Sequence, residues 1–321
     1  MNHLLKPASF LVGGFFYILL SGCSSIPLQS EPILTNKPKE LASFVEIKNT
    51  PFNPQLEYQC GPSSLATLFQ FNGLDIHPDR LNAEVYLPGR KGSLQVELVA
   101  TTRQHDLLPY IIDKQLLALL KELQAGNPVL VLQNLGLDWF PQWHYAVVIG
   151  FDLEHGQIFL RSGTHKRHVN TFALFEKTWR RADYWGMVVL PLNKLPTTAT
   201  PFRYLSSAVA FEKLGKLEQA RAAYATGLAK WPNNRHLLMA AGNINFQLKD
   251  IEQAEKQYRS VLELWPDYAP ALNNLAHIEL LNKNFDAAET LIGKAIQHGG
   301  RFKKEYLHTL DMILKARQQN R

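Results

Sequence analysis

Cys60 has the clearest capacity for covalent chemistry in this 321-residue chain. It stands before Gly61 and Pro62, and proline is favoured in the first turn of a helix. We therefore predict a helix over residues 61–71 with the thiol at its start. Unpaired backbone N–H groups and the helix dipole at such a position lower the pKa of a thiol and can stabilise an oxyanion. The alternative is a buried, inert cysteine, because cysteine is common in protein cores.

His144 is the candidate partner of this thiol. It lies 84 residues after Cys60, within the aromatic-rich sequence WFPQWHYAVV at the start of an apolar stretch. A thiol needs a base to become a nucleophile, and a leaving amine needs a proton, which a histidine can supply. The alternative is a structural histidine that ends a strand. The two residues together predict nucleophilic catalysis with Cys60 as nucleophile and His144 as general base.

The first 22 residues have the pattern of a lipoprotein export signal. Lys6 precedes an apolar run over residues 10–20, which is short for a membrane span, and small residues precede Cys23. We expect cleavage before Cys23 and acylation of its thiol, which makes Cys60 the free thiol of the exported chain. Ser24 follows in place of the aspartate that favours inner-membrane retention, so we expect an outer-membrane lipoprotein facing the periplasm. An ordinary cleaved signal and a transmembrane anchor are the alternatives.

Composition divides the remainder of the chain. Residues 23–43 contain three prolines and are expected to form a tether, residues 44–192 a first domain, and residues 201–302 a second one closed by a helix over residues 303–321. The second domain and its closing helix hold 17 basic and 12 acidic residues, whereas residues 23–200 hold 16 of each. This small surplus on helices is typical of a solvated face, so we expect no nucleic acid partner.

The first domain has helical patterns early and strand patterns late. The order predicts an α+β domain of the papain-like kind, in which a helix that carries the nucleophile packs on a sheet that carries the histidine. Helices are predicted over residues 61–71, 78–86, 93–105 and 114–124, and strands over residues 107–112, 129–135, 144–152, 157–162 and 184–191. Residues 163–170 (GTHKRHVN) are interpreted as a loose basic turn.

The sequences around Cys60 and His144 carry a family resemblance. PFNPQLEYQCGPSSLATL and WHYAVVIGFD resemble the bacteriocin-processing cysteine peptidases, papain-like enzymes that cut leader peptides after a double glycine. The chain is more similar to their envelope lipoprotein relatives, which carry C-terminal tetratricopeptide repeats. The resemblance covers residues 51–190. It implies a cysteine endopeptidase with Cys60 as nucleophile and His144 as base.

The same resemblance suggests the remaining site residues. Gln55 matches the oxyanion-hole glutamine of the family, although it lies one residue closer to the thiol than the family pattern has it. Gln59 is a reserve candidate. The family has an aspartate at the end of the strand that follows the histidine strand, whereas this chain has Ser162 there. Ser162 or a backbone carbonyl is therefore expected to orient the imidazole. Asp152, about 26 Å from His144 along an extended strand, is expected to be too distant.

No other chemistry is indicated. The chain has no Cys-x-x-Cys, His-Glu-x-x-His or phosphate-binding glycine loop, and its histidines lack metal-ligand spacing. We expect no cofactor and no metal.

The C-terminal part repeats with a period of 34 residues. Ala220, Ala254 and Ala288 are in register, and Trp231-Pro232 returns as Trp265-Pro266. This period, with small residues at the helix crossings, predicts an all-α solenoid of three tetratricopeptide repeats. Such stacks are concave and usually bind peptides or proteins; the alternative is a passive spacer.

These observations predict a lipid-anchored periplasmic cysteine endopeptidase whose repeats recruit a peptide or protein substrate. One alternative is a non-catalytic envelope scaffold with a degenerate peptidase groove. The other is acyl or amide transfer on cell-wall peptides by the same Cys60 and His144.

Overall fold

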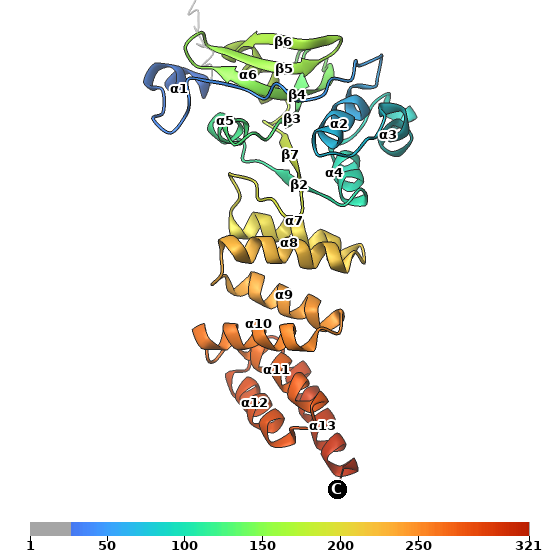
Figure 1. Cartoon of the computed structure of the whole chain (residues 1–321), viewed down its shortest axis with the longest axis vertical. Coiled ribbons are helices and arrows are strands. Elements are labelled where there is room, and N and C mark those ends of the chain that lie inside the picture. Colours follow the sequence, from blue (N-terminus) through green and yellow to red (C-terminus); the bar gives the residue numbers. More distant parts are fainter. Residues whose placement is uncertain (1–26, 321) are drawn as a thin grey trace, which may run out of the picture.

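The computed structural model describes residues 27–320 as a mixed α and β domain followed by a column of helices (Figure 1). The expected export signal and the acylation site Cys23 lie outside the described residues. Among the residues that are described, no helix is both long and apolar enough to cross a membrane.

The centre of the first domain is one antiparallel sheet. Its order is β2-β7-β3-β4-β5-β6, and β1 pairs with β4 as a seventh strand. The strands are β1 (Phe44–Glu46), β2 (Leu107–Ile111), β3 (Val129–Asn134), β4 (Trp143–Asp152), β5 (Gln157–Ser162), β6 (His165–Thr171) and β7 (Gly186–Pro191).

Helices cover both faces of this sheet (Figure 1). Alternation along β3 explains this arrangement, because Val129 and Val131 enter one hydrophobic core and Leu130 and Leu132 enter the other. One face carries α2 (Cys60–Phe71), α3 (Pro78–Val85) and α4 (Gln95–Gln104), with the short 3₁₀ turn η1 (Pro88–Arg90) between the last two. The other carries α1 (Ser30–Asn36), α5 (Leu116–Gln124) and α6 (Phe172–Arg180).

The expectation of a tether over residues 23–43 is wrong for its described part. Ile33 of α1 and Leu41 are buried in the domain core. The backbone N–H groups of Gln29 and Ser30 donate to the carboxylate of Glu176 on α6 at 2.6 and 2.8 Å. Burial and these hydrogen bonds make the segment part of the first domain.

The expectation of a basic turn at residues 163–170 is also wrong, because the strand β6 begins at His165. This strand is the edge of the sheet and most of its side chains are exposed, so no apolar alternation marks it. The helix that follows, α6, was not predicted either. Its signal is present in retrospect, since the Thr171 side chain accepts a hydrogen bond from the N–H of Leu174, and Phe172, Phe175 and Trp179 are buried at helical spacing.

The second part is a stack of helical pairs, as predicted. The alanines in register, Ala220, Ala254 and Ala288, are all fully buried. The helices are α7 (Pro201–Lys213), α8 (Leu217–Lys230), α9 (Arg235–Gln247), α10 (Ile251–Leu264), α11 (Ala269–Leu281), α12 (Phe285–His298) and the closing α13 (Lys303–Gln319). The predicted fold class, an α+β domain of the papain-like kind followed by an all-α repeat solenoid, is thereby confirmed.

The two parts are joined by a packed junction. Leu108 of β2 is buried in one cluster with Tyr204 and Phe211 of α7. The segment between the two predicted domains, residues 193–200, is held as well, since the carboxylate of Glu122 accepts hydrogen bonds from the N–H and hydroxyl of Thr198, both at 2.7 Å.

Candidate active site

Cys60 is the first residue of α2, so its sulfur lies at the N-terminal end of that helix. Gln59 occupies the N-cap position and makes no side-chain cap. The N–H of Ser63 donates to the carbonyl of Gln59 at 3.0 Å, while Pro62 has no N–H to satisfy. The thiol is half-buried, and Cys60 is a free cysteine.

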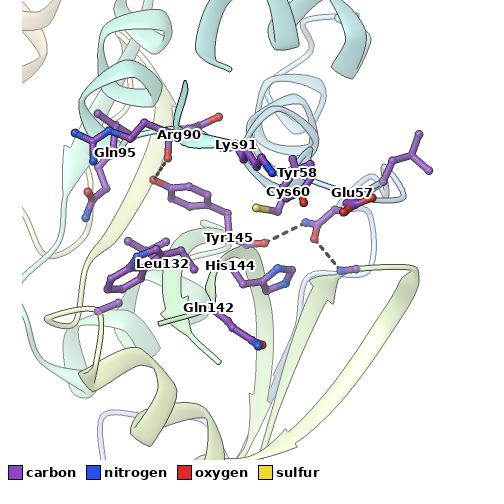
Figure 2. A pocket seen from close by; sticks show the side chains of 18 of the residues that line it. Glu57, Tyr58, Cys60, Arg90, Lys91, Gln95, Leu132, Gln142, His144 and Tyr145 are labelled. Atoms are coloured by element: carbon purple, nitrogen blue, oxygen red, sulfur yellow. Dashed lines mark hydrogen bonds between the residues drawn. The ribbon is translucent and has the colours of Figure 1, made fainter. Parts of the chain in front are cut away.

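His144 reaches the same place from the sheet. It is the second residue of β4. This part of β4 extends beyond the end of β5, because β4 pairs with β5 only from Val147 onward. Cys60 and His144 both line one open cavity of about 980 Å³ between the α2 side and the tip of β4, where Figure 2 shows their side chains. Helix and sheet therefore bring the two residues to one site although 84 residues separate them in the chain.

Ser162 contacts the imidazole. It is the last residue of β5, and its Oγ lies 2.8 Å from Nε2 of His144. Asp152 lies at the other end of β4, where its carboxylate accepts from the N–H groups of Glu154 and His155. The structure thus brings Ser162 to His144 and keeps Asp152 away from it.

Both polar atoms of the Gln55 side chain make hydrogen bonds. Its Nε2 donates to Oγ of Ser64 at 2.9 Å and to the carbonyl of Tyr145 at 3.1 Å. Its Oε1 accepts from the N–H of Gly163 at 2.9 Å. Both hydrogens of the Gln55 amide, which was expected to bind an oxyanion, are therefore already used in hydrogen bonds within the protein. Gln59, the reserve candidate, is not among the residues that line the cavity.

The backbone of Tyr145 is a part of the site that the sequence analysis missed. Tyr145 pairs with Leu132, but the N–H of Leu132 donates to Trp185 of the segment before β7. The N–H and carbonyl of Tyr145 consequently point away from β3, toward Cys60 and Gln55. Its position directly after His144 was the available signal.

Burial dominates the titration of both candidate catalytic groups. Desolvation raises the pKa of the Cys60 thiol, although backbone hydrogen bonds from Tyr145, Gly61 and Cys60 itself oppose this change. Desolvation, helped by the charge of His168, lowers the pKa of His144 to about 4. The expectation that the helix start lowers the pKa of the thiol is not met, because desolvation is the larger effect. Near neutral pH the cavity therefore holds a thiol and a neutral imidazole.

Within residues 27–320 no cluster of three or more histidine, cysteine, aspartate or glutamate side chains could hold a metal ion. Charged residues also line the cavity, namely Glu57, Arg90, Lys91, Arg181 and Asp183. The arrangement can perform covalent attack by a thiol with proton transfer to an imidazole, which needs no metal.

Comparisons with known proteins agree with the two-part architecture. Residues 47–187 match a family model described as Peptidase_C39 like family. Residues 205–269 and 246–301 match two models described as tetratricopeptide repeat. The chain therefore contains a C39-like peptidase domain followed by tetratricopeptide repeats. A specificity for bacteriocin leaders and a lipoprotein anchor stay predictions.

Solved structures resemble the two parts separately. A protein described as a candidate C39-like peptidase from Bacillus anthracis is 19% identical with a TM-score of 0.39, and the match covers 46% of this chain and 98% of that one. The first TPR of Spaghetti (RPAP3), bound to an HSP90 peptide, is 19% identical with a TM-score of 0.34, covering 36% and 91%. The Yersinia enterocolitica secretion chaperone SycD, in complex with a YopD peptide, is 14% identical with a TM-score of 0.34, covering 37% and 92%. A search of the curated proteins finds no match to this chain.

Proposed function

We propose that this chain is a lipid-anchored cysteine endopeptidase of the periplasm. The observation that carries the proposal is the meeting of Cys60 and His144 in one cavity of a C39-like peptidase domain, with Ser162 on the far nitrogen of the imidazole. The anchor rests on the N-terminal sequence pattern and on Cys23 as the acylated residue.

Acylation follows from this arrangement of groups. Because Ser162 occupies Nε2 of His144, Nδ1 is the nitrogen that takes the proton from the thiol of Cys60. The sulfur then forms a bond to the carbonyl carbon of the substrate, and the oxygen gains negative charge near the start of α2. When the carbon–nitrogen bond breaks, the same proton passes from Nδ1 to the leaving amine.

Deacylation reverses the proton path. His144 accepts a proton from water as the water oxygen bonds to the thioester carbon, and the sulfur leaves and recovers the proton as a thiol. Since the resting pair is neutral, proton transfer accompanies attack, in contrast to a site that holds a thiolate in advance.

The repeats support recruitment of a peptide or protein. A hollow of about 270 Å³ on them is lined by polar and aromatic side chains that can contact a peptide backbone, namely Asn243, Phe246, Gln247, Tyr258, Asn274 and His277. Tetratricopeptide stacks present such concave surfaces to protein partners. A docking module beside a peptidase domain fits an enzyme that selects its substrate away from the site of cleavage.

The test compares wild type with Cys60→Ala. Purified protein is incubated with detergent-extracted cell-envelope proteins, and new N-termini are identified by mass spectrometry. We expect cleavage products with the wild type and none with Cys60→Ala, because the alanine keeps the fold and removes the nucleophile. A matched control is Thr67→Ser on the same helix, which keeps the hydroxyl that accepts from Asn53 and leaves the thiol in place. An identical product set from wild type and Cys60→Ala would refute the peptidase assignment.

Three observations favour the alternative, a non-catalytic scaffold whose peptidase groove holds a peptide. The raised pKa of Cys60, the lowered pKa of His144 and a hydroxyl in the third position all weaken thiolate formation. A scaffold predicts that Cys60→Ala retains its cellular phenotype and its bound envelope partners.

A further inference from the structure

We propose that the loop between β3 and β4, residues 135–143, docks onto a lipid bilayer that contains anionic phospholipids. We call this segment the aromatic loop. The proposal rests on the lipid anchor of the proposed function, and it adds a second contact between the peptidase domain and the membrane.

The aromatic loop exposes a dense group of large apolar side chains. Five of its nine residues are large and apolar, and each of the five is at least half exposed, namely Leu135, Leu137, Trp139, Phe140 and Trp143. Trp139 is 81% exposed. Single exposed apolar residues are ordinary on a protein surface, whereas a contiguous patch marks a surface that binds a protein or a membrane.

Hydrogen bonds hold this loop in one shape. The side-chain Oδ1 of Asn134 accepts from the N–H groups of Gly136 and Gln142 at 3.0 and 2.9 Å. Leu137 and Phe140 exchange backbone hydrogen bonds at 3.2 and 3.1 Å. The tip of the loop is therefore already ordered in the folded chain, which lowers the entropy that docking would cost.

The N-terminal anchor must lie close to this loop. The N–H of Gln29 donates to Glu176 of α6, and Arg181, which follows α6, donates to the carbonyl of Gly136 at 2.7 Å. Glu176 and Arg181 are five residues apart, which is about 8 Å along a helix. Cys23 precedes Gln29 by six residues, so it lies within about 22 Å of Gln29 even if the chain is fully extended. An acyl chain on Cys23 therefore holds this side of the domain at the membrane.

The charge beside the loop favours an anionic surface. Residues 172–182 carry three basic side chains, namely Lys177, Arg180 and Arg181. The one acidic side chain of that segment, Glu176, is buried, and the one charge within the aromatic loop is Asp138. Tryptophan and phenylalanine rings beside basic side chains are typical of sites that lie at the headgroup level of a bilayer. This composition favours a lipid surface over a substrate polypeptide as the occupant.

Docking through this loop places the active site at the membrane. Gln142 and Trp143 line the cavity that contains Cys60 and His144, so the cavity opens beside the lipid headgroups. The helix α6 lies at the end of the molecule away from the repeats (Figure 1). The repeats therefore extend away from the bilayer, while cleavage occurs next to it.

The experiment fixes the chain to vesicles and asks whether Trp139 enters the lipid. In residues 23–321 with Cys60→Ala, Cys23 is the one remaining thiol. It is coupled to a maleimide-bearing phospholipid in vesicles of phosphatidylcholine and phosphatidylglycerol. Tryptophan emission is then compared between plain vesicles and vesicles whose phosphatidylcholine carries bromine near the headgroup end of its acyl chains, because bromine quenches an indole that it touches.

We expect the brominated vesicles to lower the emission and Trp139→Phe to remove most of this loss. Phenylalanine keeps the loop apolar, so only the reporter is lost. The matched control adds Phe202→Trp to the Trp139→Phe chain, because Phe202 is 78% exposed but lies on α7 of the repeats. We expect the indole at that position to emit equally in both kinds of vesicle.

Equal emission from Trp139 in brominated and plain vesicles overturns the proposal. Slower cleavage of soluble envelope peptides by Trp139→Ala would then assign the loop to substrate binding, and a dimer that this variant loses would assign it to a second copy of the chain. Maleimide coupling replaces acylation and Cys60→Ala removes cleavage, so the result depends on neither activity. A wild-type envelope protein whose Cys23 carries no acyl chain by mass spectrometry refutes the anchor alone.

Discussion

At the start of α2, burial and hydrogen bonding act on the thiol of Cys60 in opposite directions. Backbone hydrogen bonds from Tyr145, Gly61 and Cys60 favour the thiolate, and desolvation disfavours it by more. His144, with its pKa lowered to about 4, is a base that stays neutral through the physiological range. The chemistry of the site therefore depends on a proton transfer that is coupled to attack.

The pH dependence of alkylation follows from these directions. Iodoacetamide reacts with the thiolate, whose fraction falls as pH falls below the thiol pKa. Because burial raises that pKa, we expect the rate at Cys60 to climb steadily from pH 6 to pH 9 without reaching a plateau. Stopped-flow or quenched alkylation with mass detection measures this profile. A plateau between about pH 5 and pH 8 would instead show a preformed thiolate–imidazolium pair.

Ser162→Asp provides the comparison. A carboxylate beside Nε2 favours the imidazolium, so it raises the pKa of His144 and stabilises a thiolate next to it. We expect alkylation of this variant at pH 7 to exceed that of the wild type by about tenfold, the change that one pKa unit produces. Ser162→Ala, which adds no charge, controls for loss of the hydroxyl.

At the scale of elements, the repeat stack depends on the close approach of its paired helices. A Cβ added at Gly242 on α9 would lie 2.5 Å from Cε1 of Tyr258 on α10. That ring is 2% exposed, and its hydroxyl donates to Asn243 at 2.9 Å, so it cannot move aside. The glycine is required by the approach of the two helices.

Alanine substitutions at two glycines test this crossing. Gly242→Ala should lower the free energy of unfolding, since overpacking costs about 1–3 kcal/mol and the gain in helix propensity is only about 1 kcal/mol. Gly293 on α12 is exposed, with nothing within 4 Å of an added Cβ, so Gly293→Ala should gain stability from propensity alone. Urea unfolding followed by circular dichroism distinguishes the two. Equal effects of the two substitutions on the free energy of unfolding would show that the Tyr258 ring can move aside.

At the scale of the whole molecule, the junction between sheet and repeats makes one structural unit of two sequence domains. Leu108 of β2 belongs to the same cluster as Tyr204 and Phe211 of the first repeat helix. Glu122 of α5 adds hydrogen bonds to the segment that enters that helix. This packing gives the repeats a fixed position relative to the sheet that carries His144, as the continuous column in Figure 1 shows.

Leu108→Ala should weaken this coupling. Truncation of a fully buried leucine costs about 2–5 kcal/mol, and here the cavity opens between the two parts. We expect calorimetry to resolve two thermal transitions in the variant, with the repeats melting separately from the peptidase domain. Leu214→Ala, at a leucine that is 55% exposed, should change stability by less than about 0.5 kcal/mol. A single unshifted transition in Leu108→Ala would mean that Leu108 does not contribute to this coupling.

Local patterns in the sequence were enough to determine the repeats, the helix that begins at Cys60 and the strand that begins near His144, because periodicity, caps and prolines act over a few residues. They failed at the packed segment around α1, at the exposed edge strand β6 and at α6, where contacts distant in sequence decide the structure. The site divides in the same way. The thiol, the imidazole and Ser162 could be named from residue types and family likeness, whereas the engagement of Gln55 and the raised pKa of Cys60 arose only when α2 met the tip of β4 that extends beyond β5. Burial and hydrogen-bond partners belong to the assembled fold, and no stretch of chain contains them by itself.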